Sequence, residues 1–362
     1  MAELLKHVYN EALFKQFCEK LKQVYPLFDE QYFMTQLFDE EWAQRELKQR
    51  TRHISHTLGA TLPQSYAEAI DILSKIVPEC KGFEYLFLPD FVEVYGLSDW
   101  ETSIPALKLF TTSISAEFAV RPFIEQNPER MMAIMEEWAV DDSEHVRRLA
   151  SEGCRPRLPW AAPLTIFKVD PSPIIPILQR LKADDSEYVR KSVANNLNDI
   201  TKDHPELVKA ICKEWIGQNS KTDWIVKHAS RTLLRKADPE TLSLFGFHHN
   251  PTVHIKDLTL STEQLAIGEN FTFKFTVNNP TTDVIKLRVE YGIDFMKANG
   301  INKRKLFKIT ENTYLPGDYT FTRSHSFKNL STRKHYSGKH QIAIVLNGVE
   351  MAGIDFILGE EK

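Results

Sequence analysis

The chain has 362 residues, of which 42% are hydrophobic and 26% are charged, and its formal net charge is −4. This composition is typical of an ordinary soluble protein of about two domains. No run of about 18 apolar residues is present, so we expect no membrane-spanning segment. The four cysteines lie far apart without C-x-x-C spacing, which disfavours a zinc site or a disulfide framework. The first residues do not resemble a signal peptide, and we expect a reducing, cytoplasmic location.

Residues 1 to about 245 show helical spacing of apolar side chains nearly throughout. The spacing predicts a helix over Glu11–Val24 and a second long helix over Glu41–Leu58. Two histidines in the second helix are expected to be solvated or capping rather than metal ligands. No H-E-x-x-H, glycine-rich phosphate loop or G-x-S-x-G motif is present, which disfavours metalloproteases, NTPases and α/β-hydrolases. We expect no metal or other cofactor.

Two neighbouring segments share a sequence pattern at a shift of 43 residues. Asp142–Arg148 recurs as Asp185–Lys191, Pro128 and Pro171 begin the two units, and a looser third copy spans 205–233. Each copy is predicted to be two helices joined by a short polar turn, whose Asp and Ser can cap the second helix. Helical pairs that recur at about 35–45 residues predict a HEAT-like α-solenoid, in which the second helices line a concave surface.

The second helix of the first repeat carries one acid among several cations. Arg148, Glu152 and Arg155 fall at i, i+4 and i+7 on one face. In the aligned repeats Arg148 is replaced by Lys191 and Lys227, and Glu152 by Asn195 and Arg231. A row of cations with a single carboxylate suits an enzyme that acts on a polyanion. The alternative is a surface Arg148–Glu152 pair worth a few tenths of a kcal/mol.

The charge is unevenly distributed along the chain. Residues 1–143 have a net charge of −11, residues 144–236 of +6, and residues 253–362 of +3. The basic balance thus falls on the repeats that contain the cationic row, as expected for a surface that contacts phosphates.

The sequence changes character near residue 250, where short alternating runs with Pro, Gly and Asn turns replace the helical pattern. About seven short strands are expected, and Asn347-Gly348 is a strong hairpin signal. We therefore predict a helical repeat domain over 1–247 and an immunoglobulin-like β-sandwich over 253–362. The basic segment Arg323–Lys339 is interpreted either as a DNA contact or as an ordinary solvated loop.

Three stretches of the chain resemble the AlkC family of bacterial DNA glycosylases, which are related to AlkD and excise N-alkylated bases. They are Phe87–Leu97, Ser115–Phe123 and Arg148–Trp160, and the resemblance extends over essentially the whole chain. It implies a glycosylase that hydrolyses the N-glycosidic bond of cationic bases such as 3-methyladenine in duplex DNA, as part of base excision repair. It also implies that the solenoid grips the DNA backbone without fully flipping the base, and we expect the protein to be a monomer.

The resemblance implies that Glu152 and Glu117 are the catalytic carboxylates and that Trp160 contacts the lesion. The alternatives are that Glu117 is a helix-surface acid paired with Arg121, and that Trp160 packs in the core. Six cations are expected to contact DNA: Arg148, Arg155, Arg157, Lys191, Lys227 and Arg231. The rival function is a non-catalytic HEAT-like scaffold that binds nucleic acid or protein, because fold alone does not decide function.

Overall fold

The structure, a computed structural model, describes residues 5–330 and 333–361. It divides into two compact units: Met1–Val208 with Glu214–Ala229, and Lys209–Lys213 with Ser230–Lys362. The second unit therefore begins upstream of the change in sequence character near residue 250. A small apolar cluster of Leu234, Leu242 and Phe247 lies within this unit. The Asn347 side chain also donates to the carbonyl oxygen of His248 at 2.7 Å, which ties the segment before the strands to the sandwich.

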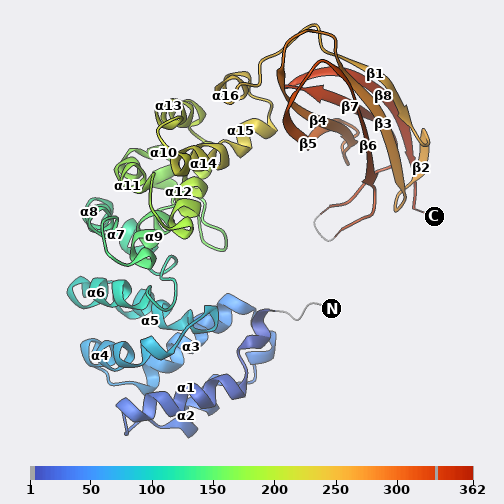
Figure 1. The fold of residues 1–362 in the computed structure, drawn as a ribbon. Coiled ribbons are helices and arrows are strands. Elements are labelled where there is room, and N and C mark those ends of the chain that lie inside the picture. The colour runs from blue at the N-terminus through green and yellow to red at the C-terminus, as the bar shows by residue number, and fades with distance from the viewer. Residues whose placement is uncertain (1–4, 331–332, 362) are drawn as a thin grey trace. The chain divides into compact units, whose positions relative to one another are not determined.

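The described part of the chain up to residue 244 is helical, with short 3-10 turns between α-helices (Figure 1). Glu11–Val24 is a helix with the predicted bounds, whereas the predicted helix Glu41–Leu58 is a 3-10 turn, Trp42–Gln44, followed by α3. α3 begins late because the Gln49 side chain accepts from the Glu46 N–H at 2.8 Å, which sets an N-terminus there. The helices are α1 Glu11–Val24, α2 Glu30–Leu37, α3 Leu47–Thr61, α4 Tyr66–Ile76, α5 Phe87–Tyr95, α6 Trp100–Phe110, α7 Arg121–Gln126, α8 Pro128–Trp138, α9 Glu144–Gly153, α10 Thr165–Val169, α11 Ile175–Leu181, α12 Glu187–Ile200, α13 Pro205–Trp215, α14 Ser220–Ala229, α15 Arg231–Arg235 and α16 Pro239–Leu244.

The helices of the first unit stack as pairs, and this confirms the predicted solenoid. In Figure 1, α4, α6, α8 and α11 line one side of the stack, while α3, α5, α9 and α12 line the other. The expected serine caps do not form: Ser143 and Ser186 occupy the N-cap positions of α9 and α12 without a side-chain capping bond. Instead Asp141 and Asp184 each accept the backbone N–H of that serine at 2.8 Å. Arg147 then binds Asp184 at 2.7 Å, which joins successive repeats.

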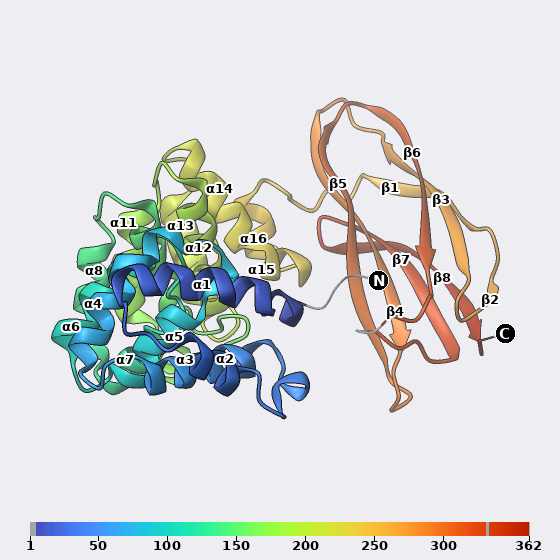
Figure 2. The same cartoon turned by 90° about the horizontal axis from the view of Figure 1, so that it is seen from below.

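The second unit contains two sheets, with strand orders β1-β3-β6 and β2-β8-β7-β4-β5 (Figure 2). All neighbouring strands are antiparallel except β2 and β8. Asn347 and Gly348 have φ values of 47° and 83°, the left-handed pair that a type I′ hairpin turn requires, so the hairpin signal is confirmed. The strands are β1 His254–Leu260, β2 Gln264–Ala266, β3 Asn270–Asn279, β4 Ile285–Met296, β5 Asn302–Tyr314, β6 Gly317–Ser326, β7 Gly338–Leu346 and β8 Val349–Gly359.

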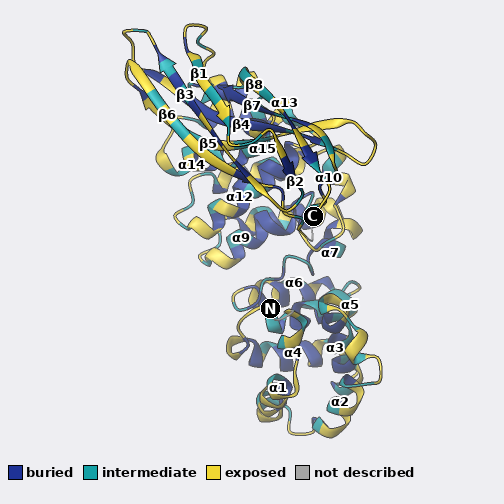
Figure 3. Ribbon diagram, turned by 90° about the vertical axis from the view of Figure 1, so that its right-hand side faces the viewer, coloured by how far each residue is buried: buried dark blue, intermediate teal, exposed yellow. Residues whose placement is uncertain are grey.

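An apolar core lies between the two sheets. β3 alternates buried Phe271, Phe273, Phe275 and Val277 with more exposed neighbours, as a strand with one buried face does. β6 is exposed along most of its length (Figure 3). The basic segment Arg323–Lys339 begins in β6 and ends in β7, and residues 331–332 within it lie outside the described residues. None of the described helices is long and apolar enough to span a membrane.

Candidate active site

Two elements of the first unit bring the two predicted carboxylates to one arginine. Glu117 lies in the loop between α6 and α7, and Arg148 and Glu152 lie on α9. The Arg148 guanidinium is 2.5 Å from Glu117 Oε2 and 3.6 Å from Glu152 Oε1. It also donates to Ser115 Oγ at 2.7 Å, and that hydroxyl donates to Glu117 at 2.8 Å. The two carboxylates therefore share one cation.

A second arginine extends this network toward the next repeat. Arg155 Nη1 lies 2.6 Å from Glu152 Oε1, and its Nε lies 2.9 Å from Asp199 Oδ2 on α12. The side chains of Glu152, Arg155 and Asp199 are 7%, 8% and 3% exposed. The predicted Arg148–Glu152 pair exists, but it is part of a buried network rather than an isolated surface pair.

The arginines stay charged in this setting. Burial by itself lowers the pKa of Arg148, but the carboxylates of Glu117 and Glu152 outweigh burial and raise the pKa above its ordinary value. The pKa of Arg155 is raised in the same way, with burial opposed by Glu152 and Asp199. Lys202 also binds Asp199, at 3.0 Å, so the network joins three carboxylates to three cations. Glu117 and Glu152 are the two carboxylates on the side of Arg148.

Aromatic side chains border the cluster. The Arg148 guanidinium lies 4.7 Å from the centre of the Tyr188 ring, a cation–π arrangement. Trp160 lies in the loop after α9 and is 60% exposed, so the alternative that it packs in the core is wrong. It lines a small cavity with Ser115 and Phe118, the residues on either side of the Ala116-Glu117 pair. An exposed indole thus lies beside the loop that carries Glu117.

Arg121 holds the Trp160 loop rather than Glu117. Its guanidinium donates to the carbonyl oxygens of Gly153 at 3.0 Å, Arg155 at 2.9 Å and Ala162 at 2.6 Å. The alternative pairing of Glu117 with Arg121 is therefore wrong. Burial lowers the pKa of Arg121, whose guanidinium contacts carbonyl groups rather than a carboxylate. These contacts fix the end of α9, where Glu152 lies, relative to the loop.

The glycine after Glu152 permits a close approach of two backbone segments. A Cβ atom at Gly153 would lie 2.5 Å from Val120 Cγ2, closer than real Cβ atoms approach. The missing side chain lets α9 pack directly against the end of the loop that carries Glu117.

The other predicted cations have varied surroundings. Arg157 forms an ion pair with Asp203 at 2.7 Å, and Lys191 pairs with Glu187 at 2.8 Å on the exposed face of α12. Lys227 lies on α14 and is partly buried. Arg231 lies on α15, which belongs to the second compact unit. The other five predicted cations lie in the first unit.

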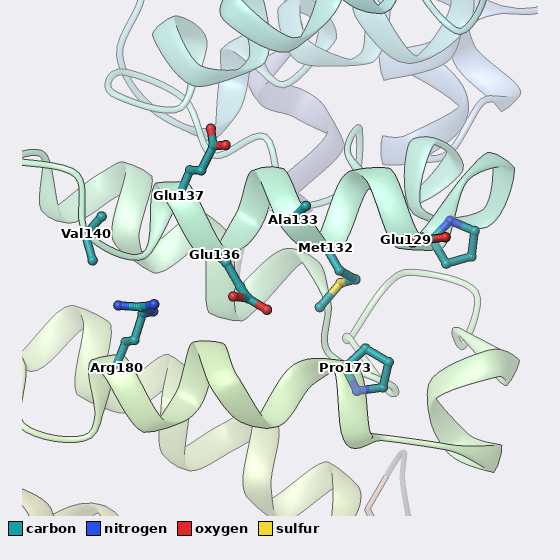
Figure 4. A pocket seen from close by; sticks show the side chains of 9 residues that line it. Glu129, Met132, Ala133, Glu136, Glu137, Val140, Pro173 and Arg180 are labelled. Carbon is teal, nitrogen blue, oxygen red and sulfur yellow. The ribbon is translucent and has the colours of Figure 1, made fainter.

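A groove of about 710 Å³ lies elsewhere, between α8 and α11 on the opposite side of the stack (Figure 4). Glu136 of α8 faces Arg180 of α11 across it, and Met132 faces Pro173. None of the predicted site residues lines this groove. Among the described residues, no group of three or more His, Cys, Asp or Glu is arranged to hold a metal ion.

Sequence reasoning missed Ser115, Tyr188 and Asp199 as members of the network. Ser115 is within one of the stretches that carry the family resemblance, two residues before Glu117. Asp199 lies 44 residues after Arg155, close to the repeat length, so alignment of the repeats contained a signal that Arg155 reaches the next repeat.

Comparison with known proteins shows the family of the chain. Residues 109–237 match the family model described as DNA alkylation repair enzyme, and residues 254–360 match that of the C-terminal Ig-like domain of YhaZ. The chain is 45% identical to the protein YhaZ of Bacillus subtilis, over 97% of this chain and 98% of that protein. It is 38% identical to the Pseudomonas fluorescens alkylpurine DNA glycosylase AlkC, solved bound to DNA with an abasic-site analogue. That match has a TM-score of 0.94 and covers 98% of this chain and 99% of AlkC. The chain belongs to the AlkC-type family of DNA alkylation repair enzymes.

Proposed function

We propose that this DNA glycosylase excises cationic N-alkylated bases, of the 3-methyladenine type, from duplex DNA in base excision repair. The observation that carries the proposal is the cluster in which Glu117 and Glu152 share the Arg148 guanidinium at 2.5 and 3.6 Å. The similar AlkC of Pseudomonas fluorescens binds DNA that contains an abasic-site analogue, and this supports DNA as the substrate.

The chemistry requires negative charge near the sugar. A base alkylated at a ring nitrogen is positively charged, so its N-glycosidic bond is weak and the base leaves with the bonding electron pair. The transition state resembles an oxocarbenium ion, which a nearby carboxylate stabilises. Water then forms a bond to the sugar carbon, and its proton passes to one of the two carboxylates. Glu117 and Glu152 supply both functions in this proposal.

Trp160 is proposed to contact the lesion nucleotide. Its side chain is exposed and stands beside the loop of Glu117, so the cationic base, and the sugar cation that develops as this base leaves, can approach its face. The attraction between an indole and a desolvated cation is worth up to about 2 kcal/mol. Since this attraction acts on the positive charge of the adduct, it favours alkylated over normal bases.

Arg148 and Arg155 are proposed to orient the carboxylates rather than to bind phosphates. Arg155 is buried, the Arg148 side chain is 14% exposed, and each guanidinium group already contacts two carboxylates. Phosphate contacts then fall to the other predicted cations: Arg157, Lys191, Lys227 and Arg231. With these contacts the protein, as a monomer, grips the DNA backbone and reaches the sugar without fully flipping the base, so that selection depends on the lability of cationic adducts.

The rival function is a HEAT-like scaffold that binds nucleic acid or protein and excises no base. In this network the Arg148 and Arg155 guanidinium groups are bound by carboxylates rather than left for phosphates, which a pure DNA-binding surface does not require. The test is incubation of the protein with alkylated duplex DNA, followed by measurement of free bases and abasic sites. We expect 3-methyladenine and an equal amount of abasic sites to appear. Binding of the duplex without release of any base would favour the scaffold.

A further inference from the structure

A lysine of α3 contacts both loops of the candidate site. Lys48 Nζ donates to the carbonyl oxygen of Trp160 at 2.9 Å, across 112 residues of sequence. The same Nζ lies 4.4 Å from the centre of the Phe118 ring, and Phe118 follows Glu117 directly. Lys48, Phe118 and Trp160 line one cavity of about 20 Å³ together with Ser115. Lys48 therefore joins the loop that carries Glu117 to the loop that carries Trp160.

The backbone at Trp160 needs such a contact. Its φ is 66°, in the left-handed region that residues other than glycine adopt only where their surroundings impose it. Buried Leu158 and Leu164 anchor the loop on either side, and Arg121 binds the carbonyl of Ala162. Lys48 is the residue that binds the carbonyl group of Trp160 itself.

The ammonium group of Lys48 is not held by a carboxylate of the described residues. The neighbouring carboxylates of Asp90 and Glu93 are bound by Arg52, which lies 3.0 Å from Asp90 Oδ1. Lys48 forms no ion pair with any residue that the structure describes. Its ammonium group is instead satisfied by a carbonyl oxygen and an aromatic face.

We propose that Lys48 is a positioning residue that holds Trp160 beside Glu117 in the conformation that engages the lesion. This inference rests on the proposed glycosylase function. In the free protein, however, the proposal concerns only the conformation of Trp160, which can be measured without a substrate. The competing role for an exposed lysine in a DNA-binding protein is a phosphate contact.

Three variants separate these roles. Lys48→Met removes the donor and the charge, and Lys48→Arg keeps both. Lys75→Met is the matched control, because Lys75 is an exposed lysine of the same unit that pairs with Asp71 on α4. Three quantities are measured for the full chain: the single-turnover rate of base release at saturating enzyme, the affinity for undamaged duplex, and the ¹⁹F NMR resonance of Trp160 in 5-fluorotryptophan-labelled protein. Loss of a signal in Trp160→Phe assigns that resonance.

We expect Lys48→Met to slow base release at saturation roughly tenfold, since small misplacement of a positioned group costs rate. Its affinity for undamaged duplex should fall less than about threefold. The Trp160 resonance should shift or broaden in Lys48→Met and return in Lys48→Arg, while Lys75→Met should match the parent protein. An unchanged Trp160 resonance in Lys48→Met overturns the proposal. So does an unchanged saturated rate with weaker binding and a salt slope smaller by about one, which indicates a phosphate contact. If the parent releases no base, the proposed function fails, and the resonance still decides the role of Lys48.

Discussion

Each unit of the molecule contains a buried arginine that is shared between two glutamates, yet the two networks differ in origin. In the sandwich, Arg288 binds Glu290 at 2.5 Å and also binds Glu311. Arg288 and Glu311 are direct partners across β4 and β5, and Glu290 is two residues along the same strand. In the helical unit, Arg148 binds Glu117 from a loop and Glu152 from its own helix.

The difference shows that buried charge alone does not mark a functional site. The pairing of β4 and β5 is sufficient to explain the Arg288 network, because its members share one face of two neighbouring strands. The Arg148 network needs the loop of Glu117 and two successive repeats to meet, and it lies beside an exposed tryptophan. The helical network is therefore the one we associate with chemistry, and the sandwich network with stability.

The largest expected effect is on the rate of base release, and it should distinguish the Arg148 network from the Arg288 network. Glu152→Gln keeps the size of the side chain but removes the charge that stabilises the sugar cation. We expect single-turnover base release to fall at least roughly 100-fold, or about 2.7 kcal/mol, with DNA affinity intact or slightly improved. Glu290→Gln is the matched control, because Glu290 is also a buried glutamate that binds an arginine. It should lower the melting temperature and leave the saturated rate unchanged. Near-normal turnover by Glu152→Gln would remove Glu152 from the mechanism.

Replacement of the exposed indole should have the next largest effect. Trp160→Ala removes an attraction of up to about 2 kcal/mol for the developing sugar cation, so base release at saturation should slow by up to roughly 30-fold while the melting temperature stays the same. Trp224→Ala is the control, since Trp224 is a partly exposed tryptophan that stacks on His228 in α14. Equal loss of rate in both variants would show that Trp160 has no special role.

The sandwich should also lose stability as the pH falls, because it contains a buried histidine. Burial, reinforced by the charges of Arg333, His335 and Lys305, lowers the pKa of His325 to about 4. The unfolded chain takes up this proton near pH 6.5, so the neutral folded histidine contributes stability that is fully present above pH 6.5. That stability is lost as the pH falls toward 4, by about 1.4 kcal/mol per pH unit. Denaturant unfolding of the sandwich across this range measures the slope.

His325→Phe provides the comparison for this slope, because Phe retains the aromatic packing around Phe327 and does not titrate. We expect the stability of the variant to depend less steeply on pH between about 6.5 and about 4. The same slope in both proteins would assign the acid sensitivity to other groups.

The smallest expected effect is on the affinity for DNA. Lys191→Ala removes one exposed cation from α12, so affinity should weaken similarly for all DNA sequences, and the salt slope should fall by about one. Lys75→Ala is a close control, because Lys75 and Lys191 form i,i+4 pairs of similar exposure. Salt-independent binding by the parent protein would instead favour the protein-scaffold alternative.

Local sequence was sufficient to predict much of the architecture. The 43-residue repeat and the Asn347-Gly348 turn depend on neighbouring residues, and the structure has both features as expected. The pattern predicted about seven strands where eight exist among the described residues. The alternating runs included neither β2, which has only three residues, nor β5 (Asn302–Tyr314), whose side chains alternate poorly between exposed and buried positions and whose first half is rich in Lys and Arg.

The candidate site was only partly predictable. The family resemblance named Glu117, Glu152 and Trp160, and helical spacing placed Arg148 on the same face as Glu152. Contacts that join distant segments left no local signal: Arg155 reaches Asp199 across 44 residues, and Lys48 reaches Trp160 across 112. Arg121 was considered only as a neighbour of Glu117, because its three carbonyl partners lie in a loop whose path depends on tertiary packing.

The most direct test of the central claim compares two abasic-site analogues in otherwise identical duplexes. One carries a cationic pyrrolidine in place of the sugar, and the other carries a neutral tetrahydrofuran. If Glu117 and Glu152 stabilise a sugar cation, the parent protein should bind the pyrrolidine duplex at least about tenfold more tightly than the tetrahydrofuran duplex. Glu117→Gln and Glu152→Gln should lose most of that preference, and Glu290→Gln should keep it. Equal affinity of the parent protein for the two duplexes, or an undiminished preference in Glu152→Gln, would contradict the account.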